Sequence, residues 1–143
     1  MILNFSKNRS YAKTQVRKLA GKPFGLWKRI KNYALTHQKY LIIDGNDELI
    51  ELFKHHSKLP YCTIDLRPSG ILLWFKIGKD LMSLPLPYYS LTVFKGSEYF
   101  QVYGGKWRVK LAITADETNN RDLIRQILMA KHENTSDITQ YYG

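Results

Sequence analysis

This chain of 143 residues, of which 44% are hydrophobic, is long enough for one domain, or one domain with an extension, and too apolar for a disordered chain. Its single cysteine, Cys62, excludes an intrachain disulfide and a zinc site built from cysteines. The longest apolar run, residues 71–75, is far shorter than the roughly 20 residues of a membrane-spanning helix.

The formal net charge of +10 lies entirely in the first part of the chain. Residues 1–40 contain ten Lys or Arg and no Asp or Glu, whereas residues 41–143 contain twelve of each kind. This asymmetry marks two units with different roles. Together with the residue periodicities given below, it predicts a basic helical extension at 1–40 and a sheet domain at 41–133, followed by a polar tail at 134–143. The basic segment favours an acidic partner.

Residues 6–36 have helical periodicity. The first half carries apolar side chains at helical spacing, namely Tyr11, Ala12, Val16, Leu19 and Ala20. Gly21 and Pro23 interrupt this pattern. The stretch that follows places Phe24, Trp27 and Ile30 on one side and Lys28, Arg29 and Lys31 on the other. The pattern predicts two short helices or one kinked helix.

Residues 40–43 form a short apolar run that is compatible with a strand and is followed by Asp44-Gly45. Asn46 is suited to cap a helix that begins at Asp47-Glu48 and has Lys54-His55-His56 in its last turn. A β-hairpin that turns at Asp44-Gly45 is the alternative interpretation of the same residues.

From residue 59 onward the apolar pattern changes to a period of two, which indicates strands. Six strands are expected, at residues 61–67, 71–77, 80–85, 89–95, 98–103 and 106–113. Glycine and proline residues separate them, and the short breaks predict an antiparallel meander. After Ala115 the pattern becomes helical again, with Asn119 or Asn120 as the cap. The apolar stripe of this helix consists of Leu123, Ile124, Ile127 and Leu128.

Two-residue turns at Gly96-Ser97 and Gly104-Gly105 would set the register of the last three strands. Val93 would then lie opposite Phe100, and Val102 opposite Trp107. This register assigns one face to the core, with Leu91, Val93, Phe100, Val102, Trp107, Val109 and Leu111. The other face would carry Tyr99, Gln101, Tyr103, Lys106, Arg108 and Lys110.

Residues of about 60–132 resemble the bacterial pleckstrin-homology-like (PH-like) domains. The resemblance rests on the segments Leu66-Arg67-Pro68-Ser69-Gly70-Ile71 and Leu84-Pro85-Leu86-Pro87-Tyr88 and on the helix expected at 120–131. It implies an α+β fold in which a bent antiparallel sheet, or partly open barrel, of about six strands is closed by a C-terminal helix. The basic cluster that binds inositol phosphates in eukaryotic members has no counterpart, because only Arg67 and Lys76 lie on the first two strands. The resemblance therefore implies a binding scaffold.

The basic extension is the first candidate for a binding surface. Bulky apolar residues flanked by Lys and Arg are typical of a helix at an anionic interface. The residues expected to contact an acidic surface are Arg17, Lys18, Lys22, Phe24, Trp27, Lys28, Arg29 and Lys31. We expect a cytoplasmic, non-catalytic module that docks on an anionic membrane, at its inner face, or on an acidic protein. The alternative interpretation is that Phe24, Trp27 and Ile30 dock on the chain's own sheet.

The polar face of the last strands is the second candidate. Its tyrosines and cations, Tyr99, Tyr103, Lys106, Arg108 and Lys110, have the composition of a surface that stacks bases and neutralises phosphates. This composition predicts a nucleic-acid-binding protein as the alternative function, and a solvated outer face is the simpler explanation. No nucleophile with a base, no metal-ligand spacing and no phosphate-binding loop is recognisable, so we expect neither an enzyme nor a cofactor.

Overall fold

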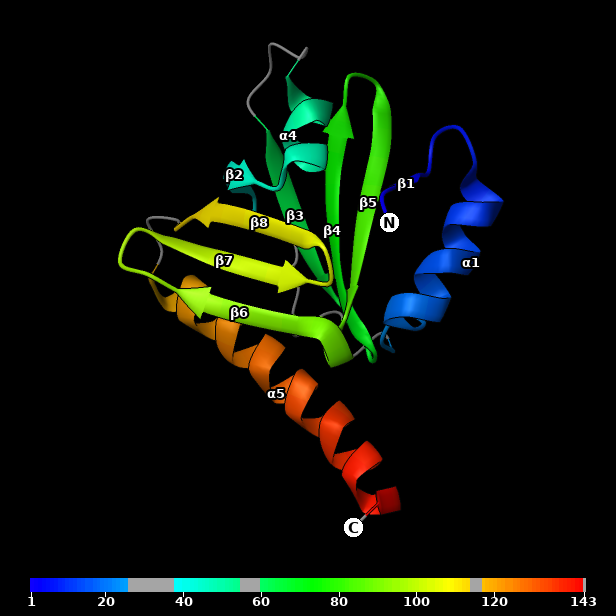
Figure 1. Ribbon diagram of the computed structural model, residues 1–143, viewed down its shortest axis with the longest axis vertical. Coiled ribbons are helices and arrows are strands. Elements are labelled where there is room, and N and C mark those ends of the chain that lie inside the picture. The colour runs from blue at the N-terminus through cyan, green and yellow to red at the C-terminus, as the bar shows by residue number, and fades with distance from the viewer. Residues whose placement is uncertain (26–37, 55–59, 114–116, 143) are drawn as a thin grey trace.

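The period-two segments of the sequence form strands in the computed structural model, which describes residues 1–25, 38–54, 60–113 and 117–142 (Figure 1). The strands are β1 (Leu3–Asn4), β2 (Tyr40–Gly45), β3 (Tyr61–Leu66), β4 (Gly70–Ile77), β5 (Asp80–Pro87), β6 (Leu91–Lys95), β7 (Tyr99–Gly104) and β8 (Trp107–Ala112). The α-helices are α1 (Arg9–Ala20), α4 (Asp47–Phe53) and α5 (Glu117–Tyr142), and a short 3-10 helix, η1, spans Tyr88–Ser90. Each of the six segments expected as strands after residue 59 contains a strand, although Tyr89 and Ser90, expected in the fourth, belong to η1.

The strands form one antiparallel sheet in the order β1-β5-β4-β3-β2-β8-β7-β6. The sheet thus contains eight strands rather than about six, because β1 and β2 also belong to it. The strand β2 includes the apolar run at residues 40–43 that was compatible with a strand. The prediction of one continuous meander is wrong at a single connection, since β5 and β6 are not neighbours. Pro87 ends β5, and η1 leads the chain away to the opposite edge of the sheet.

Strand β2 joins the two halves of the sheet. Tyr40 and Leu41 pair with β3, whereas Ile42, Asp44 and Gly45 pair with β8 across a register shift. A shift of this kind bends a strand. In Figure 1 the strands β6, β7 and β8 accordingly run across β3, β4 and β5 at a steep angle. The helix α4, and not a β-hairpin, follows Asp44-Gly45.

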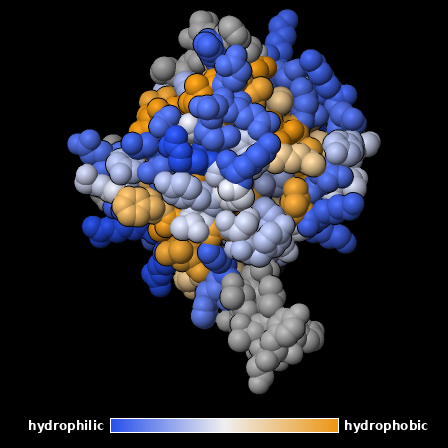
Figure 2. Space-filling model, in the orientation of Figure 1, coloured by the Kyte–Doolittle hydropathy of each residue, from blue (hydrophilic) through white to orange (hydrophobic). Residues whose placement is uncertain are grey.

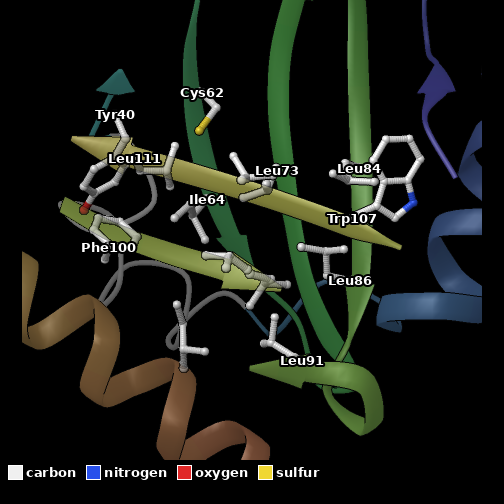
Figure 3. Packing of buried hydrophobic residues seen from close by; sticks show 14 of the residues in the cluster. Tyr40, Cys62, Ile64, Leu73, Leu84, Leu86, Leu91, Phe100, Trp107 and Leu111 are labelled. Atoms are coloured by element: carbon white, nitrogen blue, oxygen red, sulfur yellow. The ribbon is translucent and has the colours of Figure 1, made fainter. Parts of the chain in front are cut away.

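The main core lies between the two halves of the sheet (Figure 3). Phe100 of β7 and Tyr40 of β2 meet edge to face with their ring centroids 5.4 Å apart. Leu123 and Ile127 of α5 are buried in the same cluster, and Ile124 is partly buried against it. Leu128, expected on the same stripe, is exposed. Beside it, Ile124 and Met129 line a shallow hollow of about 520 Å³ between α5 and Lys95 of β6.

A second, smaller core lies on the outer side of β4. Leu72 of β4 packs there with Ala12 and Val16 of α1 and with Leu3 of β1. Because Ile71 and Leu73 point into the main core, β4 is buried on both faces. This explains the continuous apolar run at residues 71–75, which is typical of a strand covered on both sides. Within the basic first part of the chain, β1 and α1 therefore pack on the sheet.

The registers of β6, β7 and β8 differ from the predicted ones by two positions. Val102 pairs with Val109, and Val93 pairs with Val102. The turn lies at Gly105-Lys106, with Gly105 at a positive φ of 56°. Gly104 instead stays in the ladder, where a Cβ would lie 2.7 Å from Cδ2 of Leu86. Because a shift of two preserves the pleat, the predicted core face is still correct.

Cys62 lies in β3 and is buried in the main core. Burial raises the pKa of its thiol to about 12. Since the thiolate is the reactive form, we expect an aromatic disulfide reagent at pH 8 to modify the native protein at least about 100-fold more slowly than the denatured chain. Absorbance of the released thiolate measures both rates, and equal rates would contradict a buried thiol.

Within the described residues, no helix is both long and apolar enough to cross a membrane.

Candidate functional site

The helix α1 carries a row of cations beside its buried stripe. Arg9, Lys13 and Arg17 are spaced four residues apart, so they lie on one side of the helix. All three are exposed, as are Lys18 and Lys22. Within the part of the chain that the structure describes, none of these five cations forms an ion pair. The side of the molecule occupied by α1 is correspondingly hydrophilic in Figure 2. Arg17, Lys18 and Lys22, the described cations expected to contact an acidic surface, are thus exposed to solvent.

A groove of about 580 Å³ runs between α1 and the sheet. It is lined by Phe5, Ser6, Arg9, Lys13, Val16, Arg17, Pro23, Arg67, Trp74 and Leu81. The rings of Phe5 and Trp74 meet edge to face in it, with centroids 4.7 Å apart. The groove therefore combines an aromatic wall with four cations, and no carboxylate is among these described lining residues. We call these residues the α1 groove.

Arg67 connects the end of α1 to the sheet and is only 8% exposed. Its Nε lies 2.9 Å from Oδ2 of Asp65, and its Nη1 donates to the carbonyl of Gly21, which follows α1. The carbonyl of Arg67 in turn accepts a 2.7 Å hydrogen bond from the hydroxyl of Tyr88. Burial raises the pKa of that hydroxyl. These bonds hold one end of the α1 groove in place.

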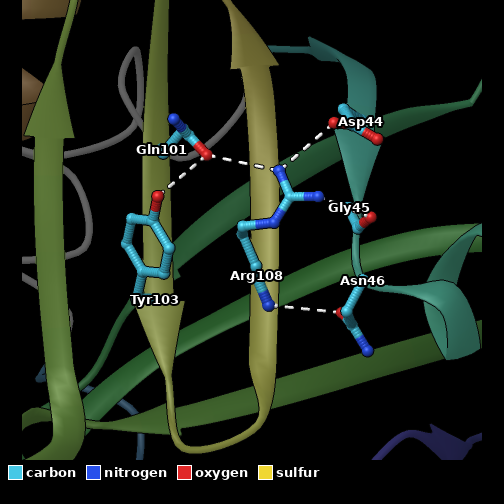
Figure 4. A network of polar contacts seen from close by, with 6 residues as sticks. All are labelled: Asp44, Gly45, Asn46, Gln101, Tyr103 and Arg108. Carbon is cyan, nitrogen blue, oxygen red and sulfur yellow. Dashed lines mark hydrogen bonds and ion pairs between the residues drawn. The ribbon is translucent and has the colours of Figure 1, made fainter.

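The predicted strand face is also assembled, but its charge is largely compensated (Figure 4). Arg108 donates to Asp44 at 3.2 Å, to the carbonyl of Gly45 at 2.9 Å and to Gln101 at 3.4 Å. The backbone N–H of Gly45, and then Arg108, lower the pKa of Asp44. Gln101 also accepts a hydrogen bond from the hydroxyl of Tyr103.

The two lysines of the strand face have partners as well. Lys106 lies 2.8 Å from Oε2 of Glu48, and Lys110 lies over the ring of Tyr99 at 4.1 Å from its centroid. Two of the three cations on this face are thus paired with carboxylates that come from β2 and α4. This pairing makes the strand face a weaker site for an anion than its composition suggested.

Asn46 stands at the N-terminus of α4, as predicted, but its side chain does not cap the helix. Its Oδ1 accepts a hydrogen bond from the backbone N–H of Arg108 instead. A cap residue normally satisfies the free N–H groups of its own helix. Here the side chain fastens the start of α4 to β8.

Phe24 is half-buried and packs against the main core, in agreement with the interpretation that it docks on the chain's own sheet. Trp27, Lys28, Arg29, Ile30 and Lys31 lie outside the described residues. The same holds for His37, His55 and His56, whereas His132 is exposed on α5. In the described part of the chain, no group of three or more His, Cys, Asp or Glu side chains could hold a metal ion.

The interpretation of the sequence missed the residues that complete the α1 groove, Phe5, Arg9, Lys13, Arg67 and Trp74. Two signals were present. The four-residue spacing of Arg9, Lys13 and Arg17 indicates one helix side, and the apolar run at 71–75 indicates a strand with a cover on its second face. Comparison with family models, curated proteins and solved structures finds no match to this chain.

Proposed function

We propose that this chain is a non-catalytic binding module that docks on an anionic surface, of a membrane or an acidic protein, through its basic N-terminal region. Arg17, Lys18, Lys22, Lys28, Arg29 and Lys31 supply the charge, and Trp27 is the apolar anchor. Phe24, the second anchor expected from the sequence, packs against the main core of the chain instead. One observation carries the proposal. The apolar stripe of α1 is buried on the sheet while its cations stay exposed and unpaired within the described residues.

We also propose that the scaffold is PH-like. Strands β2 to β5 follow one another in the sheet, and so do β6 to β8. The two meanders pack around one core, and the α-helix that follows them contributes Leu123 and Ile127 to it. A fold does not by itself define a function, so the proposed binding role rests on the surface of α1 and not on the scaffold.

The strand face, the candidate surface for nucleic-acid binding, is less suited to hold an anion than the exposed side of α1. Arg108 and Lys106 are held by Asp44 and Glu48, so an incoming anion would have to compete with these carboxylates. The cations of α1 have no such competitors among the described residues. We therefore place the docking surface on the N-terminal region.

Vesicle flotation tests this function. Each basic residue near an anionic membrane contributes about 1 kcal/mol, so replacing Arg17, Lys18 and Lys22 by Gln should weaken binding to vesicles of phosphatidylserine and phosphatidylcholine by about 100-fold. Vesicles of phosphatidylcholine alone should not bind the protein. The protein fraction that floats with the vesicles gives the affinity.

The matched control replaces Lys39, Lys79 and Lys95 by Gln, which removes the same charge from exposed positions elsewhere. This control should lose far less affinity. Equal losses in the two variants, or equal flotation with neutral vesicles, would contradict docking through this surface. Binding that is unaffected by Trp27→Ala would exclude Trp27 as an anchor.

A further inference from the structure

The α1 groove contains a linear array of positive charge. Along an α-helix, four residues advance the chain by about 6 Å, so Arg9, Lys13 and Arg17 form a row with a regular spacing. The row lies next to the buried stripe of Ala12 and Val16, and for this reason it borders the groove instead of pointing straight into solvent. Regularly spaced cations along one wall fit a ligand with regularly spaced anionic groups.

The opposite wall is aromatic and rigid. Trp74 lies in the middle of β4, paired with Thr63 on one side and Ser83 on the other, and its ring is only partly buried. Phe5 packs against that ring and supports it. An accessible aromatic ring on an inner strand of a sheet is a surface on which an unpaired base can stack.

Nearby carboxylates are already engaged. Asp65 is paired with Arg67, and Asp80 lies 3.5 Å from Lys7 and accepts a 3.1 Å hydrogen bond from Asn4. Among the described residues no acidic side chain lines the α1 groove. The potential in the groove is therefore set by the cations of α1.

We propose that the α1 groove binds a short stretch of single-stranded nucleic acid, with phosphates along Arg9, Lys13 and Arg17 and a base stacked on Trp74. The inference goes beyond the proposed function, because it assigns a second kind of anionic partner to the same basic region. A volume of about 580 Å³ suits a few groups of a strand and is too small for a duplex. A flat membrane would contact the outer cations but not an aromatic ring inside a groove.

Fluorescence anisotropy of a labelled oligothymidylate, titrated with the full chain at low salt, tests the base contact. Trp74→Leu should weaken binding about tenfold, since base stacking on an aromatic side chain is lost. Trp74→Phe keeps a ring and should bind within about twofold of the unmodified protein. Equal affinity of all three proteins would overturn the stacking contact and with it the inference.

The phosphate contacts have a separate test that leaves the core untouched. Replacing Arg9, Lys13 and Arg17 by Gln should weaken binding about 100-fold at low salt and reduce the slope of log affinity against log salt by about 2. The control with Gln at Lys39, Lys79 and Lys95 should keep most of the slope. A variant with Gln at Lys106 and Lys110 should also keep most of the salt slope. A reduced slope in this variant would instead show that the oligonucleotide binds to the face formed by β7 and β8.

Competition and vesicle binding separate the remaining outcomes. A duplex of the same length should compete poorly with the single strand, and so should free thymidine monophosphate. Equal competition by either would overturn the proposal of a strand in the groove. If the protein binds anionic vesicles but not the oligonucleotide, this inference alone is overturned. If the protein binds neither the oligonucleotide nor the vesicles, the proposed function is overturned as well.

Discussion

Replacing Phe100 by Ala should lower the free energy of unfolding by about 3–5 kcal/mol. Phe100 is fully buried in β7, between Leu111 of β8 and Lys95 of β6 in the ladder. Its ring contacts Tyr40 of β2, the strand that joins the two halves of the sheet. Truncation would leave a cavity where the two halves of the sheet meet. The neighbouring side chains are closely packed and cannot move far enough to fill that cavity.

Denaturant unfolding followed by circular dichroism gives this free energy. Phe94→Ala is the matched control, because Phe94 lies on the neighbouring strand β6 and is 53% exposed. Its loss should cost no more than about 0.5 kcal/mol. Similar losses for both variants would contradict the placement of the core between the two halves.

Replacing Val16 by Asp should detach α1 from the sheet. Val16 is buried against Leu3 and Leu72, and Asp has a similar volume, so the change introduces a charge without crowding. An unpaired buried charge costs about 3–5 kcal/mol. The helix can avoid this cost by undocking, which limits the effect to α1 and β1 while the main core remains folded.

Limited trypsin digestion detects this undocking, because Arg9, Lys13, Arg17 and Lys18 are all cleavage sites on α1. We expect rapid cleavage there in Val16→Asp, together with faster hydrogen exchange of the α1 amides. Tyr11→Asp adds the same charge on the exposed side of the helix and should leave cleavage slow. Rapid cleavage in the unmodified protein would contradict a docked α1.

Most elements of the fold could be predicted from the sequence. The strands β3, β7 and β8 and the helix α1 alternate buried and exposed side chains with the period of their own backbone, so their positions follow from local pattern alone. The strands β4 and β5 do not alternate, and they could be predicted because glycine and proline residues delimit their apolar runs. The strand β1 could not be found in this way, because two residues do not make a period. The register of β7 and β8 was misplaced by two because Gly104 was assigned to the turn, while packing against Leu86 keeps it in the ladder. The register of β6 and β7 was misplaced because Gly96 pairs with Tyr99, which moves that turn to Ser97-Glu98.

The candidate site was predicted less completely. Charge composition identified Arg17, Lys18 and Lys22, of which only Arg17 lines the α1 groove. The groove also contains Trp74 from β4 and Phe5, which the fold brings beside α1. For the strand face, the residues could be predicted but their compensation by carboxylates could not. Its tyrosines and cations could be predicted from alternation, but their partners Asp44 and Glu48 could not, since they lie 64 and 58 residues away in the chain.

The sequence by itself determined where the charge lies, which segments are strands or helices, and which side of each is apolar. These properties follow from composition and from the periods of 2 and about 3.6 residues, which are local. Only the tertiary structure decided that β2 joins two half-sheets, that α1 covers β4, and which cations are compensated by carboxylates. These outcomes depend on contacts between distant residues, and local periodicity carries no information about which distant residue becomes the partner.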